Sequence, residues 1–124
     1  MPPFPTLESP FILAPMAGVT DVAFRELCKR YGAGLTLTEF LSSEALRRSS
    51  ERVWRKVRRG EHERPFGVQL FGASVESIVE AAKAVAPHCD LIDLNLGCPA
   101  WKVVRCGAGS ALLETPEKIH DIVK

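Results

Sequence analysis

No stretch of this sequence is apolar for long, no sign of charge dominates it, and its first residues lack the features of a secretory signal. A helix that crosses a bilayer needs roughly 20 apolar residues, and no run approaches that length. The start, MPPFPTLESP, has no basic region followed by an apolar one. Lys and Arg number 16 against 15 Asp and Glu, and this net charge of +1 excludes a uniformly basic nucleic-acid-binding protein. We therefore expect a soluble cytoplasmic protein without a membrane partner, in which any electrostatic signal is local.

The cysteines follow no metal-binding or disulfide pattern. Cys28, Cys89, Cys98 and Cys106 include no C-x-x-C pair, and without a secretory signal they are interpreted as free thiols in a reducing compartment. A zinc site is the weaker alternative, and no metal ligands are predicted. Cys28 lies on the apolar face of a predicted helix and Cys89 just before a predicted strand, so both are expected in or near the core. Cys106 is expected in an exposed loop.

Short apolar runs alternate with segments of helical periodicity along the chain. The predicted strands cover residues 11–15, 35–39, 66–70 and 91–95, and the predicted helices cover residues 20–31, 43–59, 74–86 and 115–124. Strands that alternate with helices indicate an α/β fold, built from parallel (βα) repeats with right-handed crossovers.

Each predicted strand ends close to a polar or conformationally special residue: Pro15, Glu39, Gln69 and Asn95. The carboxyl ends of barrel strands converge on one mouth, where active sites are built, so this pattern favours a TIM (β/α)8 barrel over an open sheet. A whole barrel needs about 250 residues. We therefore expect residues 1–124 to form a single partial domain, about half of such a barrel. Its first and last strands would be unpaired, which predicts self-association of the isolated half-barrel.

Cys98 is the candidate for chemistry, within the stretch DLIDLNLGCPAWKV. Free cysteine is usually a buried structural residue. This one follows Asn95 outside the predicted sheet, between Gly97, which permits a sharp turn, and Pro99, which restrains the backbone. The histidines lie in or beside predicted helices, with nothing to tie them to Cys98, so a thiolate nucleophile is not indicated. A thiol that keeps its proton can act as a general acid.

Taken together, four segments resemble the amino-terminal part of the tRNA dihydrouridine synthase family. They are APMAGVTDVAFR at 14–25, GAGLTLTEF at 32–40, VQLFG at 68–72 and IDLNLGCPAWKVVRCGAGSALL at 92–113. The resemblance covers Phe11 to about Ile119 in the family's order. It implies an oxidoreductase of tRNA processing, built on a flavin-binding TIM barrel of which this chain is the amino-terminal half. In this family, reduced FMN that is recharged by NADPH passes hydride to C6 of a uridine in tRNA. The cysteine that matches Cys98 protonates C5, giving dihydrouridine.

The resemblance also implies which residues contact the cofactor and the base. The family's FMN contacts fall on Pro15, Met16 and Ala17, where backbone at a strand end lies against the flavin, and on the amide of Gln69. Asn95 matches an asparagine near both the flavin and the uracil. Two bland alternatives stay open: Asn95 as the cap of the turn before the thiol, and Met16 as a gap-filler in the core.

RNA contact is predicted for two basic regions of unequal strength. Residues 44–64 hold eight Lys or Arg against four Asp or Glu, with Trp54 among them, but such a run is more often a solvated helix face. Lys102 and Arg105 follow the cysteine loop directly and are the better phosphate-binding candidates, because they would share the barrel mouth with the chemistry.

Two other functions remain as alternatives. The first is a flavin dehydrogenase acting on free pyrimidines, which shares the barrel and places a cysteine near the base; the full set of motifs argues against it. The second is a non-catalytic half-barrel that only binds RNA or associates with itself. The segments that hold the flavin phosphate and grip tRNA in the family are not recognisable here, so the chain alone is expected to be an incomplete enzyme.

Overall fold

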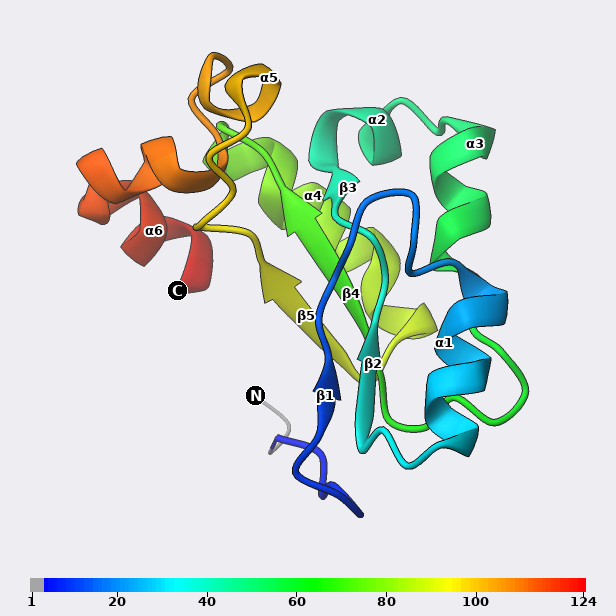
Figure 1. Ribbon diagram of the computed structural model, residues 1–124. Coiled ribbons are helices and arrows are strands. Elements are labelled where there is room, and N and C mark those ends of the chain that lie inside the picture. Colours follow the sequence, from blue (N-terminus) through cyan, green and yellow to red (C-terminus); the bar gives the residue numbers. More distant parts are fainter. Residues whose placement is uncertain (1–3) are drawn as a thin grey trace.

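A computed structural model describes residues 4–124, which form a curved parallel sheet with helices along its outer side (Figure 1). The strands are β1 (Ile12–Leu13), β2 (Leu35–Leu37), β3 (Leu41–Ser42), β4 (Phe66–Phe71) and β5 (Leu91–Leu94). The α-helices are α1 (Val22–Arg30), α2 (Ser43–Arg47), α3 (Glu51–Trp54), α4 (Val75–Val85), α5 (Trp101–Val104) and α6 (Pro116–Val123). Short 3₁₀ turns cover Arg55–Val57 (η1), Ala86–His88 (η2) and Gly109–Glu114 (η3).

Strand order in the sheet follows the order of the chain. β1 pairs with β2, β2 and β3 lie along the same edge of β4, and β5 pairs with the other edge. All of these pairs are parallel. Sequential parallel strands joined by helical crossovers are the arrangement of a (β/α) barrel. The predicted α/β fold, part of a TIM barrel, is therefore confirmed.

The second predicted strand, residues 35–39, is shorter than expected because a bulge interrupts it. Leu37 pairs with Gly67 and Leu41 pairs with Leu70, so four steps on one strand match three on β4. One extra residue therefore sits between β2 and β3, as in a β-bulge. The hydroxyl oxygen of Thr38 replaces a backbone acceptor in the ladder, because it accepts from the backbone N–H of Gln69 at 3.1 Å. Glu39 lies in this bulge, and bulges re-aim side chains.

Local capping accounts for the helix boundaries. Asp21 caps α1 by accepting from the Phe24 amide at 2.9 Å, and Gly32, with φ of 92°, follows the end of that helix. The helix predicted over 43–59 is instead broken into α2, α3 and η1. Ser49 adopts a φ of 54°, and the Ser50 amide donates back to Ala45 at 3.0 Å, which closes α2.

The core lies between the outer face of the sheet and the helices. Phe66, Val68 and Leu70 of β4 are fully buried against Ala81 and Val85 of α4. These three residues occupy every second position of the strand, so Gly67 and Gln69 face the opposite side of the sheet. A Cβ atom at Gly67 would collide with Leu37 and Leu91, whose side chains fill the space above it.

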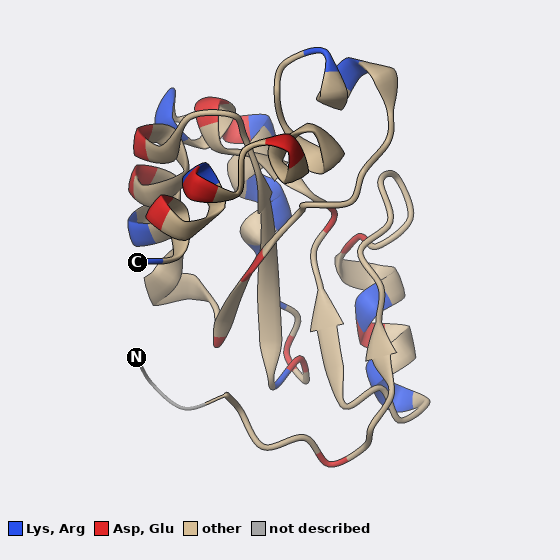
Figure 2. Cartoon of the chain, turned by 90° about the vertical axis from the view of Figure 1, so that its left-hand side faces the viewer, with Lys and Arg blue, Asp and Glu red and all other residues tan. Residues whose placement is uncertain are grey.

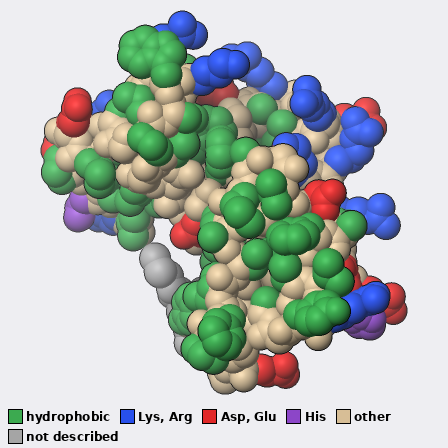
Figure 3. Space-filling view, viewed as in Figure 1, with side chains coloured by type: hydrophobic (Ala, Val, Ile, Leu, Met, Phe, Trp, Pro, Cys, Tyr) green, Lys and Arg blue, Asp and Glu red, His purple; other side chains and the backbone are tan. Residues whose placement is uncertain are grey.

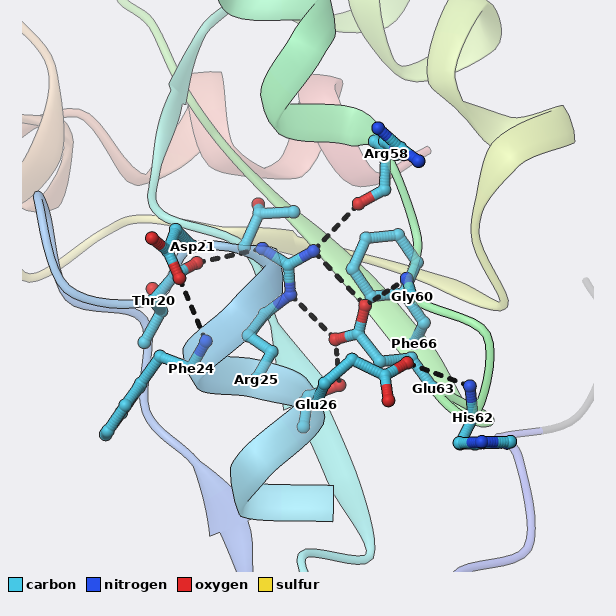
Figure 4. Close-up of polar contacts among 12 residues, drawn as sticks. Thr20, Asp21, Phe24, Arg25, Glu26, Arg58, Gly60, His62, Glu63 and Phe66 are labelled. Atoms are coloured by element: carbon cyan, nitrogen blue, oxygen red, sulfur yellow. Dashed lines mark hydrogen bonds and ion pairs between the residues drawn. The ribbon is translucent and has the colours of Figure 1, made fainter. Parts of the chain in front are cut away.

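An ion pair between Arg25 of α1 and Glu63, in the connection before β4, is buried in this framework (Figure 4). The two side chains are 1% and 0% exposed. Arg25 Nε and a terminal guanidinium nitrogen donate to the two carboxylate oxygens at 2.7 and 3.2 Å, and the guanidinium lies 5.0 Å from the centroid of the Phe66 ring. The remaining contacts are with backbone: Arg25 donates to the carbonyls of Thr20 and Arg58 at 2.8 Å each.

Glu63 is saturated with donors. Besides Arg25, it accepts from the Thr36 hydroxyl at 2.9 Å and from the Gly60 amide at 2.6 Å. A buried charge pair is tolerable only when its hydrogen bonds are complete, and here both partners are satisfied. The pair thereby joins the turn after β1, the helix α1, the strand β2 and the approach to β4.

The first strand leaves apolar surface uncovered in the part of the chain that the structure describes. Phe11 and Ile12 are 74% and 50% exposed, and β1 has its pairing partner on one side only. This is the open edge on which the predicted self-association depends, and the association itself stays a prediction. Among the described residues, no helix has the length and apolar character needed to span a membrane.

Breaking the ion pair from one side should destabilise the protein strongly. We predict that Arg25→Met lowers the free energy of unfolding by about 3–5 kcal/mol, because Glu63 then stays buried without its cation. Arg25→Lys keeps the charge but loses the two-pronged contact, so it should fall between Arg25→Met and wild type. The measurement is the urea midpoint of the whole protein. The control is Arg30→Met on the exposed end of the same helix, expected within about 0.5 kcal/mol of wild type. Equal midpoints for the two Met variants would contradict the role of the pair.

Candidate active site

The predicted site residues gather at the carboxyl ends of the strands, as expected for a barrel. Pro15 follows β1, Glu39 follows β2, Gln69 lies near the end of β4 and Asn95 comes directly after β5. Because the sheet is parallel, all of these positions lie at the same end of the sheet, the one where the strands have their carboxyl ends. The structure connects them in two groups, one around Gln69 and one around Glu39.

The first group is a hydrogen-bonded row across β4 and β5. Gln69 and Asp93 are register partners on these strands, and Gln69 Nε2 donates to Asp93 Oδ2 at 2.5 Å. Asn95 Nδ2 donates to Gln69 Oε1 at 3.1 Å. The row fixes which way the Gln69 amide points. A primary amide has two N–H donors and two acceptor lone pairs, so this amide keeps one donor and one acceptor for another partner.

Asn95 also shapes the turn that carries the thiol. Its Oδ1 accepts from the Cys98 amide at 3.0 Å, while its own backbone N–H donates to Leu70 at 2.9 Å. Gly97 is not among the glycines with positive φ, so the Asn95 side chain holds the turn rather than a special glycine conformation. The capping alternative for Asn95 is confirmed, and its amide nitrogen contacts Gln69 at the same time.

The far side of the cysteine loop is closed by the segment after α5. The Ser110 amide donates to the Cys98 carbonyl at 3.2 Å. Gly109, with φ of 61°, packs so closely that a Cβ atom there would lie 2.7 Å from that carbonyl oxygen and 2.8 Å from Val103. Cys98 is therefore held on both sides and remains half-buried.

The other thiols occupy different environments. Cys28 and Cys89 are half-buried, and Cys89 packs against the core as predicted, whereas Cys106 is exposed as predicted. Burial, followed by the neighbouring charge of Asp90, raises the pKa of the Cys89 thiol, which disfavours a thiolate there.

The second group ties the turn after β1 to the bulge. The Thr20 hydroxyl oxygen lies 3.1 Å from both the amide and the carbonyl of Met16, and the Gly18 amide donates to Glu39 Oε2 at 2.6 Å. Met16 is 39% exposed, so it does not fill the core. Pro15 is half-buried and Ala17 is exposed. This stretch therefore presents backbone and a flexible type of apolar side chain at the carboxyl end of the sheet.

Glu39 is charged under ordinary conditions. Lys56 Nζ lies 3.0 Å from Glu39 Oε2, the same oxygen that accepts from Gly18. Burial acts to raise the pKa of the Glu39 carboxyl, but the Gly18 hydrogen bond and the charge of Lys56 outweigh it, so the pKa lies below its usual value. The carboxylate therefore clamps the turn after β1 to η1.

The two groups touch through neighbouring residues of the bulge rather than directly. The Thr38 hydroxyl oxygen accepts from the backbone N–H of Gln69, and the side chain of the next residue, Glu39, accepts from the backbone N–H of Gly18. The structure thus brings Gln69, Asn95 and Cys98 into one hydrogen-bonded set and leaves Pro15 to Ala17 in another at the same edge.

Lys102 and Arg105 lie on and just after α5, beyond the cysteine loop. Both are exposed, and within residues 4–124 neither forms an ion pair. Val103, between them, is 6% exposed and anchors the helix. The two cations are therefore free to meet an anion, at the end of the molecule where the site residues gather.

Much of the other basic region is occupied in internal contacts. Lys56 pairs with Glu39, the Arg58 carbonyl accepts from Arg25, and Trp54 packs edge-on against His88 with 5.6 Å between ring centroids. One cleft of about 470 Å³ is lined by Trp54, Val57, Arg58, Arg59, Gly60, Glu61, Pro87 and His88. A second, of about 320 Å³, is lined by Asp21, Val22, Ala23, Arg25, Glu39, Arg55, Lys56 and Arg58. Gln69, Asn95 and Cys98 line neither of these two clefts.

Sequence reasoning missed Asp93, which orients Gln69, and the pair of Arg25 with Glu63. A signal existed for Asp93, since a carboxylate inside the apolar run LIDLN must have a buried partner. None existed for Arg25 and Glu63, whose separation in the chain hides their contact.

Parallel (βα) repeats with polar residues gathered at the strand ends define the chain as part of a (β/α) barrel with its candidate site at the mouth. The family model described as dihydrouridine synthase (Dus) matches residues 12–124, and the chain belongs to this family. The resemblance inferred from the motifs is therefore confirmed.

Curated relatives agree with the family assignment. The chain is 46% identical over 114 residues to a probable tRNA-dihydrouridine synthase of Rhizobium leguminosarum bv. phaseoli, covering 91% of this chain and 36% of the relative. It is 42% identical over 121 residues to tRNA-dihydrouridine synthase B of Pseudomonas syringae pv. tomato, covering 96% and 36%. For tRNA-dihydrouridine synthase B of Vibrio cholerae serotype O1 the identity is 46% over 120 residues, covering 95% and 37%. The chain thus spans about a third of the length of these relatives.

Acid should remove the contribution of Glu39 to stability. A carboxyl whose folded-state pKa is lowered stabilises the fold fully above its unfolded pKa, and this stabilisation is lost as the pH falls through the folded value. We predict that Glu39→Gln is less stable than wild type near neutral pH, and that the difference shrinks below the ordinary value of 4.5. The measurement is urea unfolding of the whole protein as a function of pH. With the exposed Glu61→Gln as control, a Glu39→Gln difference that stays constant into acid would refute the clamp.

Proposed function

We propose that this chain is the amino-terminal part of the flavin-binding barrel of an enzyme that reduces uridine in tRNA to dihydrouridine. FMN would be its cofactor, NADPH its reductant and Cys98 its general acid. The observation that carries the proposal is the row Asp93–Gln69–Asn95–Cys98, which joins an oriented amide to a thiol held outside the sheet. Family membership and the names of the relatives support the reaction class.

The residues at this edge fit the chemistry of a flavin. A flavin ring offers an apolar face and a polar edge with donors and acceptors. The partly exposed Met16 side chain, with the backbone of Pro15 and Ala17, suits the face. The Gln69 amide keeps one donor and one acceptor for the edge, in an orientation that Asp93 fixes. When bound and reduced, FMN would supply the hydride.

Cys98 would hold and deliver the proton. Its backbone is restrained by Asn95 on one side and Ser110 on the other. The entropy of ordering this loop would therefore not have to be lost when the reaction occurs. The Asn95 amide, tied to Gln69, would orient the uracil beside it. Lys102 and Arg105 would bind phosphates of the tRNA close to this point.

Removing the thiol should separate the two half-reactions. In Cys98→Ala we predict intact FMN binding and normal flavin reduction by NADPH. Oxidation of the reduced flavin by tRNA should slow by about 10² to 10⁴, the usual contribution of a positioned acid. The measurement is a single turnover that follows the return of oxidised-flavin absorbance after tRNA is added to the reduced whole protein. The matched control is Cys106→Ala, which removes an exposed thiol eight residues after Cys98.

The same experiment distinguishes the alternative functions. Wild-type reoxidation in Cys98→Ala would demote the thiol to a structural role. Reoxidation by free uracil but not by tRNA would favour a free-pyrimidine dehydrogenase. A protein without bound flavin that still binds tRNA would favour a non-catalytic RNA-binding module.

Asp93 should matter for flavin binding although it need not touch the flavin. We predict that Asp93→Ala weakens FMN binding by roughly tenfold, because the Gln69 amide loses the partner that orients it. Asp93→Asn should restore most of the affinity, since its carbonyl oxygen still accepts from Gln69. Quenching of FMN fluorescence on binding to the apoprotein gives the affinities. Wild-type affinity in Asp93→Ala would show that the row does not orient a flavin contact.

A further inference from the structure

Trp101 is an exposed aromatic residue beside the cysteine loop. It is the first residue of α5 and is 71% exposed, although its neighbour Val103 is buried and anchors the helix. The Trp101 carbonyl accepts from the Arg105 amide at 2.9 Å. A large apolar side chain is thus presented to solvent from an ordered segment, three positions beyond Cys98.

The surface around Trp101 is basic. The chain has no acidic residue between Asp93 and Glu114, whereas Lys102 and Arg105 are both exposed. Seen from the side, the α5 loop carries basic and no acidic residues (Figure 2). In the space-filling view, Lys and Arg side chains gather along the upper edge, next to hydrophobic surface at the α5 end (Figure 3). An aromatic face flanked by cations complements one class of ligand well, a nucleotide with its stackable base and its phosphate.

A second exposed aromatic residue shows why position matters. Tyr31 is 87% exposed and follows Lys29 and Arg30, so its chemistry is similar. It lies after α1, in the connection that leads into the amino end of β2. Functional residues of this fold lie at the carboxyl ends of the strands, where Trp101 lies and Tyr31 does not.

We propose that Trp101 is a stacking platform for an unpaired base of the RNA substrate, adjacent to the uridine that Cys98 serves. This inference rests on the proposed function, since it takes RNA as the substrate. Lys102 and Arg105 hold the phosphates on either side of the stacked base. An enzyme that does chemistry on a base acts on a single-stranded segment or takes the base out of its stack, and in both cases neighbouring bases can lack a stacking partner. Trp101 supplies it.

Stacking and phosphate contact respond differently to salt, which makes the inference testable. Base–aromatic stacking is worth about 10- to 100-fold in affinity for one base and releases no counterion. Trp101→Ala should therefore weaken tRNA binding by about that factor while the slope of log affinity against log salt stays the same. Lys102→Gln and Arg105→Gln should each reduce that slope by about one.

The experiment titrates the whole protein into a fluorescently labelled, unmodified tRNA transcript and follows anisotropy at several salt concentrations. Trp101→Phe keeps an aromatic face and should recover most of the affinity lost in Trp101→Ala. Tyr31→Ala is the matched control and should bind as wild type. Thermal melting of each variant should match wild type, because an exposed side chain contributes little to stability.

Several results would overturn the inference. Wild-type affinity in Trp101→Ala excludes stacking, even if the enzyme reduces tRNA normally and the proposed function stands. A lowered melting temperature in Trp101→Ala, with no rescue by Trp101→Phe, means that the indole packs against another part of the protein. Absence of tRNA binding in the wild type overturns the proposed function and the stacking role together.

Discussion

The buried ion pair of Arg25 with Glu63 is the contact on which the rest of the structure depends. Its two charges are removed from water, which is tolerable because each partner is also hydrogen-bonded to neighbouring groups. Those neighbours belong to the turn after β1, to β2 and to the segment that enters β4. The pair therefore ties the first three (βα) units to one another at defined positions.

The same contact reaches the candidate site through Thr20. Arg25 holds the Thr20 carbonyl, and the Thr20 hydroxyl holds the Met16 backbone. Glu39 reaches that turn from the opposite direction, out of a bulge between β2 and β3. The stretch around Met16 is thus positioned by two hydrogen-bonded networks: the buried one around Glu63 and the partly exposed one around Glu39. Such preorganisation would suit the flavin contact that we propose for this segment.

Much of the fold and part of the site could be predicted from the sequence. Alternating apolar runs and helical periodicity predicted the parallel (βα) order, because a strand buried on both faces and an amphipathic helix each leave a local pattern. Motifs identified the family and marked Gln69, Asn95 and Cys98. The helix expected over 43–59 is broken at Ser49 instead, and the strand expected over 35–39 ends at Leu37. The first difference comes from the positive φ of Ser49 and the second from the extra residue of the bulge between β2 and β3. Neither feature leaves a mark in the local pattern of apolar and polar residues.

What the sequence determined by itself is what short-range periodicity and residue type can encode: the order of the elements, the faces they bury, the family, and a cysteine placed beyond the end of a strand. Only the tertiary structure decided that Asp93 orients Gln69, that Asn95 holds both that amide and the Cys98 turn, and that Arg25 finds Glu63 across 38 positions of chain. Hydrogen bonds are short and directional, so the partner of a buried polar group is known only when distant segments have been brought within about 3 Å of each other.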